Sequence, residues 1–286
     1  MNYSHLSKLK PSHKIHLHRK VYFPWNKEIK YLWFRLLIQN LRRPSSLITS
    51  LIQPLLWLIL FGSLFKNMPI GLFYGNHRYE DFLSYGIIMF SSFTGSLNAG
   101  LTLIFDREFG FLNRLLTAPI YYKESILMSY TLFVICFTMI QTFTIMLFHT
   151  NIFCYSIKTI FTFLIIILVT ILAMSNISVI IAFKLPGHIE FLAFSLIMNL
   201  PILFSSTTLA PLSFMPHWLQ VLSSLNPLTY GIESIRFIFS KTNWNYTENI
   251  QNLWPCLSLL EIILAFLVIS AISCISITQI ITNHLD

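Results

Sequence analysis

Six long stretches of mostly apolar residues constrain this chain more than any other feature of its sequence. The hydrocarbon core of a bilayer is about 30 Å thick and takes about 20 residues of α-helix to cross. The apolar residues form continuous blocks, without the periodic stripes of half-buried helices and strands. The predicted fold class is therefore an all-α integral membrane protein, with six transmembrane helices near residues 47–65, 82–105, 125–148, 157–183, 191–212 and 254–281.

The composition excludes an ordinary soluble domain. Hydrophobic residues make up 55% of the chain and charged residues 10%, whereas soluble domains carry about 25% charged residues. The 19 Lys and Arg residues outnumber the 11 Asp and Glu residues, a balance that can indicate nucleic-acid binding. Ten of the basic residues, however, precede the first apolar stretch, where the positive-inside rule places them in a membrane protein. We therefore expect membrane lipid, and no nucleic acid, as a partner.

The positive charges also orient the predicted helices. With the N-terminus inside, the inner tail and loops hold 14 Lys and Arg residues. The outer loops hold five, at Lys66, Arg78, Lys158, Arg236 and Lys241. The positive-inside rule then places both termini on the cytoplasmic side, or on the stromal side of a plastid membrane.

Residues 27–43 are too charged to span a membrane but fit a helix that lies on its surface. Glu28, Arg35, Gln39 and Arg42 share one narrow stripe of a helical wheel, and apolar side chains cover much of the remainder. We expect an interfacial helix here; a signal anchor or a basic linker is the alternative. Residues 1–24 form a basic tail that we expect to be flexible.

The loop between the second and third stretches, residues 105–119, predicts a short amphipathic helix at the inner surface. Phe109, Leu112 and Leu115 share one helical face, two acids favour the N-terminal end, and Pro119 stops the helix. Contact with lipid headgroups is the alternative, but two acids beside the bilayer suit it poorly. We expect this helix to dock a partner protein.

A second informative segment, residues 211–236, follows the fifth stretch. Pro211, Pro216 and Pro227 cannot lie within one continuous helix, so we expect short, broken helices and not a seventh span. Trp218 would anchor them at the outer interface. Non-helical backbone at membrane depth must be covered by protein or face a water-filled cavity, and the outer mouth of a transport path is such a place.

These two segments resemble the signatures of type-2 ABC transporter permeases, a class that exports drugs, polysaccharides and lipid-linked glycans. The coupling-loop signature is matched by Asp106-Arg107-Glu108-Phe109-Gly110, Arg114 and Pro119, and the C-terminal signature by Pro211-Leu212-Ser213, Pro216-His217-Trp218-Leu219, Asn226-Pro227-Leu228-Thr229-Tyr230 and Arg236. The resemblance covers the chain from about residue 27 to its end, so we treat residues 25–286 as one permease domain with a coupling loop at 106–124.

The resemblance implies an exporter with no catalytic residue or cofactor on this chain. ATP and Mg would be bound by a separate ABC ATPase subunit, and two copies of this chain would form a homodimer around a shared path. Coupling to the ATPase is assigned to Asp106, Arg107, Glu108, Gly110, Arg114 and Pro119. The outer gate is assigned to Pro211, Pro216, Trp218, Asn226, Pro227, Tyr230 and Arg236.

The chain lacks the sequence that an ATPase site requires. A phosphate-binding loop needs Gly-x-x-x-x-Gly-Lys-Ser/Thr, and the nearest stretch, residues 95–102, has Leu101 in place of the Lys. We therefore expect that this chain does not hydrolyse ATP. Two alternatives stay open: a channel or carrier that works without ATP, and a membrane-embedded enzyme or assembly factor.

A few further residues carry expectations. Glu261 is an acid about two turns into the last predicted span, and an ionisable group at depth marks a functional site by default; a local hydrogen bond is the equal alternative. The four cysteines and the histidines have no zinc-site spacing, so no metal is expected. A pairing of Cys154 with Cys256 on the outer side is left open.

The source and the substrate are less constrained. Phe is abundant (26) and Gly scarce (9), the bias of an AT-rich genome, and some algal plastid genomes encode permeases of the type resembled. We expect a plastid membrane, with a bacterial inner membrane as the alternative. Lipid, glycan and drug exporters share the quoted motifs, so the motifs do not identify the substrate.

Overall fold

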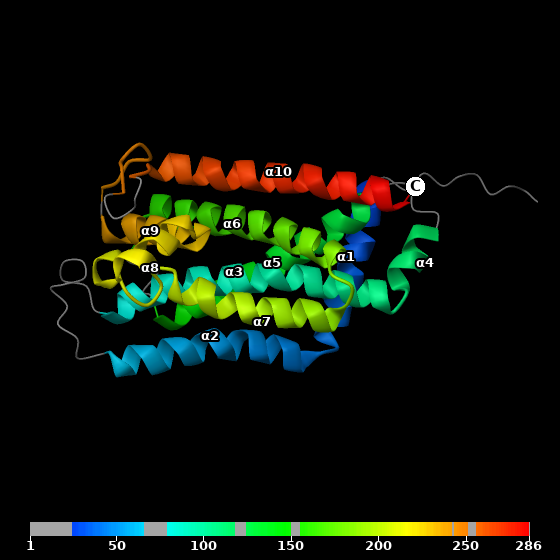
Figure 1. Ribbon diagram of the computed structural model, residues 1–286, viewed down its shortest axis with the longest axis horizontal. Helices are drawn as coiled ribbons and strands as arrows, with labels where there is room; N and C mark the ends of the chain where they lie inside the picture. The colour runs from blue at the N-terminus through cyan, green and yellow to red at the C-terminus, as the bar shows by residue number, and fades with distance from the viewer. Residues whose placement is uncertain are drawn as a thin grey trace, which may run out of the picture.

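The computed structural model describes residues 25–65, 79–117, 124–149, 155–241, 243–250 and 256–285, and within these ranges the chain is almost entirely helical. The elements are α1 (Trp25–Leu41), α2 (Pro44–Leu64), α3 (Tyr79–Glu108), α4 (Phe111–Thr117), α5 (Glu124–His149), α6 (Ile157–Lys184), α7 (His188–Phe204), the 3-10 helix η3 (Leu212–Phe214), α8 (His217–Leu225), α9 (Pro227–Ser240) and α10 (Leu259–Leu285). Helices α2, α3, α5, α6, α7 and α10 run along the long axis of the molecule (Figure 1).

Each predicted span corresponds to one of these long helices, and the all-α membrane fold is confirmed. Within the described ranges, α3, α5, α6 and α10 are long and apolar enough to cross a membrane, and α2 and α7 contribute shorter apolar helices over 48–64 and 188–204. The predicted end of the fifth span at residue 212 is wrong, because α7 ends at Phe204. There the Ser206 hydroxyl donates to the Leu203 carbonyl at 2.7 Å, a local bond that competes with continued helix.

Helix α3 lies at the centre of the bundle and contacts α2, α5, α6, α7 and α9. Its contact with α6 is close because small residues face each other. The Gly100 N–H donates to Ser178 Oγ at 3.0 Å, and a Cβ at Gly100 would lie 2.6 Å from the Ser178 carbonyl oxygen. Small residues allow such close approach between membrane helices, so α3 and α6 pack directly against each other.

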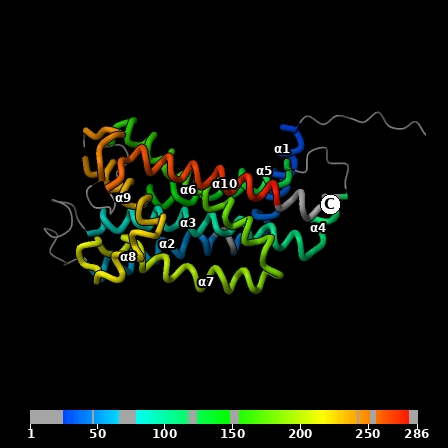
Figure 2. Tube along the Cα trace, turned by 45° about the horizontal axis from the view of Figure 1, so that its top comes forward, coloured from blue at the N-terminus to red at the C-terminus, as the bar shows by residue number. Residues whose placement is uncertain are grey.

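Helix α1 lies across one end of the bundle (Figures 1 and 2), as expected of the interfacial helix, and Pro44 begins the next helix. The predicted polar stripe partly faces the protein. Arg35 Nη2 donates to Gln39 Oε1 at 3.4 Å, and Ser125 Oγ of α5 donates to Glu28 Oε2 at 3.4 Å. The stripe therefore contacts the bundle together with the buried Leu36, whereas Phe34 and Leu41 are exposed.

A proline inside α2 is accommodated by a side chain from α5. Pro54 has no N–H, so the Ser50 carbonyl loses its partner within the helix. Gln141 Nε2 donates to that carbonyl at 2.7 Å. Neighbouring membrane helices commonly satisfy backbone groups that a proline frees, and the bond joins α2 to α5.

The two ends of the bundle hold different elements. Helices α1 and α4 and the C-terminal end of α10 lie at one end, and η3, α8 and α9 lie at the other (Figures 1 and 2). This arrangement places both ends of the described chain at the same end of the bundle, as the predicted topology requires. Following the charge count, we name the first the inner end and the second the outer end.

Candidate functional site

Three successive charged residues at the inner end of α3 each bind a different part of the bundle. The first, Asp106, is 4% exposed. It accepts hydrogen bonds from Arg35 Nη2 of α1 at 2.7 Å and from the Tyr130 hydroxyl of α5. A buried carboxylate requires such partners. Asp106 therefore joins α1 and α5 to α3.

The second residue, Arg107, binds the C-terminal end of α6. Its guanidinium donates to the carbonyl oxygens of Ala182 at 3.0 Å, Leu185 at 2.5 Å and Pro186 at 2.8 Å. The last carbonyls of a helix lack partners within it and form the negative end of its dipole, so a cation is favourable there. Arg107 therefore fixes the end of α6 to α3.

The third residue, Glu108, binds the N-terminal end of α7. One carboxylate oxygen accepts from the His188 backbone N–H at 2.6 Å, and the other contacts His188 Nδ1. His188 is the first residue of α7, and an acid complements the positive end of a helix dipole. Arg107 and Glu108 thus hold the two helix ends that meet at the α6–α7 connection.

The predicted single helix within residues 105–119 is wrong, because the chain turns at Gly110. This glycine has φ of +68°, a left-handed conformation that other residues adopt at a cost. Helix α3 continues to Glu108, and α4 starts after the turn and projects beyond the inner end (Figure 1). Asp106 and Glu108 therefore lie at the end of α3 and not on α4. Pro119, also predicted to couple, lies outside the described residues.

Helix α4 combines exposed groups with a connection to the bundle. Arg114 is exposed, and Phe109, in the turn before α4, is 70% exposed, whereas Leu112 is only 8% exposed. The Arg35 guanidinium, which binds the α3 carboxylate, also lies 3.5 Å from the centroid of the Phe111 ring. A cation over an aromatic ring is attractive. Arg35 thus connects α4 with α1 and α3.

The outer segment forms the short, broken helices that its prolines predict. Pro211 is the N-cap of η3, Pro216 is the N-cap of α8, and Pro227 lies in the first turn of α9. Proline suits a helix start because its fixed φ is helical and its missing N–H would have no partner there. Each proline therefore starts a new piece of helix.

Asn226 fastens the junction between α8 and α9. Its Oδ1 accepts from the Leu228 N–H at 3.0 Å, which caps α9. Its Nδ2 donates to the Ile202 carbonyl and to Ser205 Oγ, each at 3.0 Å. This one side chain ties the outer segment to the end of α7.

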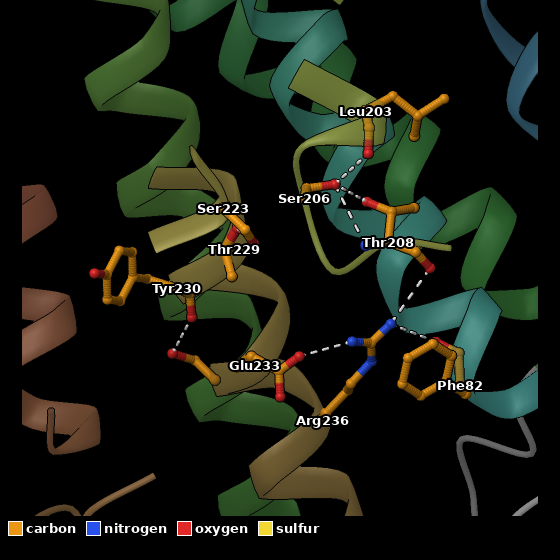
Figure 3. Close-up of polar contacts among 10 residues, drawn as sticks. Phe82, Leu203, Ser206, Thr208, Ser223, Thr229, Tyr230, Glu233 and Arg236 are labelled. Atoms are coloured by element: carbon orange, nitrogen blue, oxygen red, sulfur yellow. Dashed lines mark hydrogen bonds and ion pairs between the residues drawn. The ribbon is translucent and has the colours of Figure 1, made fainter. Parts of the chain in front are cut away.

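A buried ion pair on α9 was missed by the sequence reasoning. Arg236 was counted among outer loop charges, yet its side chain is 6% exposed and that of Glu233 is 3% exposed, with 2.8 Å between Nη1 and Oε1. Arg236 Nη2 also donates to the carbonyls of Phe82 at 3.0 Å and Thr208 at 3.4 Å, and its guanidinium lies 3.5 Å over the Phe82 ring (Figure 3). The i,i+3 spacing of an acid and an arginine was the available signal.

The two aromatic residues predicted for the outer gate lie in different surroundings. Trp218 on α8 is 66% exposed, as expected of an interfacial anchor. The Tyr230 hydroxyl on α9 donates to the Ser224 carbonyl of α8 at 2.7 Å, and its own carbonyl accepts from Ser234 Oγ (Figure 3). Tyr230 therefore holds α8 and α9 together.

The structure places Glu261 nearer to a helix start than predicted. Helix α10 begins at Leu259, so Glu261 lies in its first turn, where it is exposed. Its carboxylate accepts from the Ser258 N–H at 2.8 Å, and Ser258 Oγ accepts from the Glu261 N–H at 3.3 Å. This reciprocal pair is a capping box, so the contacts of Glu261 are local.

The pairing of Cys154 with Cys256 stays a prediction, because Cys154 lies outside the described residues.

The loop after α9 packs against the outer end of α6. Lys158 Nζ of α6 donates to the Trp244 carbonyl at 2.7 Å and lies 4.1 Å from the centroid of the Trp244 ring. Within the loop, Lys241 Nζ and Glu248 Oε1 are 2.5 Å apart. The hydrogen bond from Lys241 holds the pKa of Glu248 below its usual value.

Comparison with known proteins adds to this geometry. A profile of the family described as ABC-2 type transporter matches residues 27–240, which include both α4 and the outer segment. A protein from Porphyra purpurea named "Putative transport permease ycf38" is 50% identical over 263 residues, 91% of this chain and 90% of that protein. Proteins of the same name from Pyropia yezoensis and Cyanophora paradoxa are 50% and 47% identical and cover 91% and 79% of this chain.

Proposed function

This chain belongs to the ABC-2 type transporter family, and we propose that it is the membrane-spanning half of an exporter driven by ATP hydrolysis on a separate subunit. It is a permease subunit of a transporter and a multi-pass membrane protein. A plastid membrane is favoured as its location, which the relatives named ycf38 from Porphyra purpurea, Pyropia yezoensis and Cyanophora paradoxa support.

The contacts at the inner end of α3 carry this proposal. Helix α4 follows α3 after a single turn, and the last three residues of α3 bind α1 and α5, the end of α6, and the start of α7. A force applied to α4 therefore reaches α3 through the turn, and four further helices through the charged groups of α3. A carrier that works without ATP does not need a projecting helix that is connected to the bundle in this way.

The proposed mechanism is rigid-body coupling. The ATPase subunit docks on α4, and its closure around ATP and Mg²⁺ moves α4 together with the inner end of α3. That motion shifts the balance between inward-open and outward-open states only if the nucleotide-bound ATPase binds the two states with different affinity. Two copies of this chain, each with an ATPase, enclose the path, and α8 and α9 lie at its outer mouth. The exported substrate belongs to the lipid, glycan or drug classes.

Charge reversal on α4 tests the docking. We expect Arg114→Glu to weaken association with the co-purified ATPase at least roughly tenfold, because a mismatched charge at an interface costs several kcal/mol. ATP-driven transport should fall in parallel. Association is measured by titrating the purified full-length permease with the ATPase, and transport in vesicles that contain the complex.

Lys184→Glu is the matched control, since Lys184 is an exposed cation at the inner end, on α6 rather than α4. It should leave association unchanged. If both reversals weaken association equally, the attraction is diffuse and α4 is not the docking site. Full association and transport in the Arg114→Glu complex would remove the proposal.

A further inference from the structure

Helix α1 presents one continuous face away from the bundle. At about 100° per residue, the exposed side chains of residues 27–42 fall on one arc of roughly 120°, and the buried Leu36 lies opposite the middle of that arc. Arg42 follows α1 but continues its last turn, because its N–H donates to the Ile38 carbonyl at 3.0 Å. We call this arc the outward face of α1; it consists of Lys27, Lys30, Tyr31, Phe34, Leu41 and Arg42.

The charges of the outward face are all positive. They belong to Lys27, Lys30 and Arg42, and none of these three forms an ion pair with a described residue. The one acid of α1, Glu28, is half-buried and accepts a hydrogen bond from Ser125 Oγ of α5 at 3.4 Å. The acid therefore contacts the bundle, and the outward face has no carboxylate of its own.

Large apolar side chains lie between these cations. Tyr31 is 64% exposed, Phe34 is 54% exposed and Leu41 is 60% exposed. In water, this exposed apolar surface would be unfavourable. The head-group region of a bilayer suits the mixture, because aromatic rings and the stems of basic side chains contact hydrocarbon there while the charged groups remain near the lipid phosphates.

Both ends of α1 are held at the inner level of the membrane by helices that run along the bundle. At its C-terminal end, α2 begins at Pro44, two residues after Arg42. At its N-terminal end, Glu28 contacts Ser125 in the first turn of α5. Helix α1 lies across this end of the bundle (Figures 1 and 2), so its outward face meets the inner membrane surface along its length.

The preceding sequence adds charge of the same sign. Residues 1–24 contain five Lys and Arg residues and no Asp or Glu. Clusters of basic residues next to the inner surface of a membrane are attracted to anionic lipids. The sequence before α1 and the outward face of α1 therefore favour the same kind of partner.

We propose that the outward face of α1 binds the anionic lipids of the inner leaflet. The cations Lys27, Lys30 and Arg42 contact the lipid phosphates, while Phe34 and Leu41 contact the acyl chains beneath them. This contact needs neither ATP nor the ATPase, so the inference stands or falls separately from the proposed coupling.

Photocrosslinking of the full-length chain in lipid nanodiscs tests this face. The discs contain equal amounts of phosphatidylcholine and phosphatidylglycerol, and a trace of one or the other lipid carries a photoactivatable group near its head group. Crosslinks to residues 25–43 are quantified by mass spectrometry as the ratio between the two probes. We expect a ratio of roughly fivefold in favour of phosphatidylglycerol at low salt, which one or two cations near an anionic surface supply. The ratio should fall at high salt, because exposed charges are screened.

Two matched double variants make the result specific. Lys30→Gln with Arg42→Gln should reduce the excess of phosphatidylglycerol crosslinks by more than half. Arg114→Gln with Lys184→Gln also removes two exposed cations at the inner end, on α4 and α6, and should keep the ratio of the parent chain. Thermal unfolding of both double variants should match the parent, because the replaced side chains are exposed.

Four outcomes would overturn the proposal. Equal crosslinking by the two probes would exclude a preference for anionic lipid. An equal loss in both double variants would indicate diffuse attraction of the whole inner end, and an unchanged ratio in Lys30→Gln with Arg42→Gln would assign the preference to other residues. Loss of the α1 crosslinks when the ATPase is added would show that the outward face binds the ATPase instead of lipid.

Discussion

The inner end of α3 and the outer helix α9 both use charged side chains inside a membrane bundle, but in opposite ways. At the inner end, Asp106, Arg107 and Glu108 each bind a group on another helix. On α9, Glu233 and Arg236 bind each other within one helix. The arginine also donates to the backbone carbonyls of Phe82 in α3 and of Thr208, which follows α7. The inner charges connect helices, whereas the outer charges fix one short helix in place.

The two regions also break their helices by different means. The inner break relies on the left-handed conformation of Gly110, while the outer breaks fall at Pro211, Pro216 and Pro227. A glycine leaves the turn free to move, and a proline restricts it. The inner turn therefore depends on the backbone conformation of one glycine, and the outer turns depend on the fixed φ of prolines.

The largest loss of stability is expected when the ion pair between Glu233 and Arg236 is broken. Arg236→Met leaves the Glu233 carboxylate buried without its cation, and an uncompensated buried charge costs about 3–5 kcal/mol. We expect a strong loss of folded protein and a lower thermal unfolding temperature in detergent.

The double variant Glu233→Gln with Arg236→Met separates charge from packing. Because a buried pair replaced as a whole is often neutral, the double variant should regain most of the lost stability. If it stays as unstable as Arg236→Met alone, the bonds to the carbonyls of Phe82 and Thr208 dominate and the ion pair is secondary.

A smaller loss of stability is expected when the contacts of Asp106 at the inner end are removed. Asp106→Asn keeps the shape but removes the charge that binds Arg35 and Tyr130, and hydrogen bonds to charged groups contribute about 1.5–3 kcal/mol. Amide hydrogen exchange in α1 should become faster, while exchange in α9 stays the same. Glu124→Gln, an exposed acid in the first turn of α5, is the control and should change neither. Unchanged exchange in α1 would show that Asp106 does not hold it.

A still smaller effect is expected at the inner turn. A Cβ added at Gly110 meets nothing within 4 Å, so Gly110→Ala should destabilise only through its positive φ, by about 1–2 kcal/mol. Gly110→Asn should cost less, because Asn tolerates the left-handed conformation. Thermal unfolding of the two variants checks this order. Equal unfolding temperatures for Gly110→Ala and Gly110→Asn would mean that α4 reorients without the left-handed turn.

Much of the fold follows from the sequence because apolar length is a one-dimensional property. The six apolar stretches and the prolines of the outer segment locate the helices, and Ser258 with Glu261 is a capping pattern that would have placed the start of α10 correctly. The end of α7 was harder, since it depends on a local bond from Ser206 to the Leu203 carbonyl.

The candidate site was less predictable because its contacts join distant residues. Arg35 and Asp106 are 71 positions apart, so Asp106 looked like an exposed docking acid when it is a buried one. Glu233 and Arg236 are three positions apart on one helix, and that pair could have been predicted from spacing alone. Local pairs are visible in one sequence, and pairs between helices are not.

The smallest effect is expected in the loop that follows α9, where the charges are exposed. The hydrogen bond from Lys241 lowers the pKa of Glu248 from its ordinary 4.5, so the pair stabilises the fold fully above about pH 4.5, and this contribution is lost as the pH falls through the lowered pKa. The side chains are 45% and 41% exposed, and exposed pairs contribute little. We therefore expect a slightly lower unfolding temperature for Glu248→Gln than for the parent chain at neutral pH, with the difference shrinking as acid protonates the Glu248 carboxylate. Asp106→Asn measured in the same series should keep a larger difference at neutral pH. A Glu248→Gln difference that persists at low pH would assign the effect to packing of the loop and not to its charge.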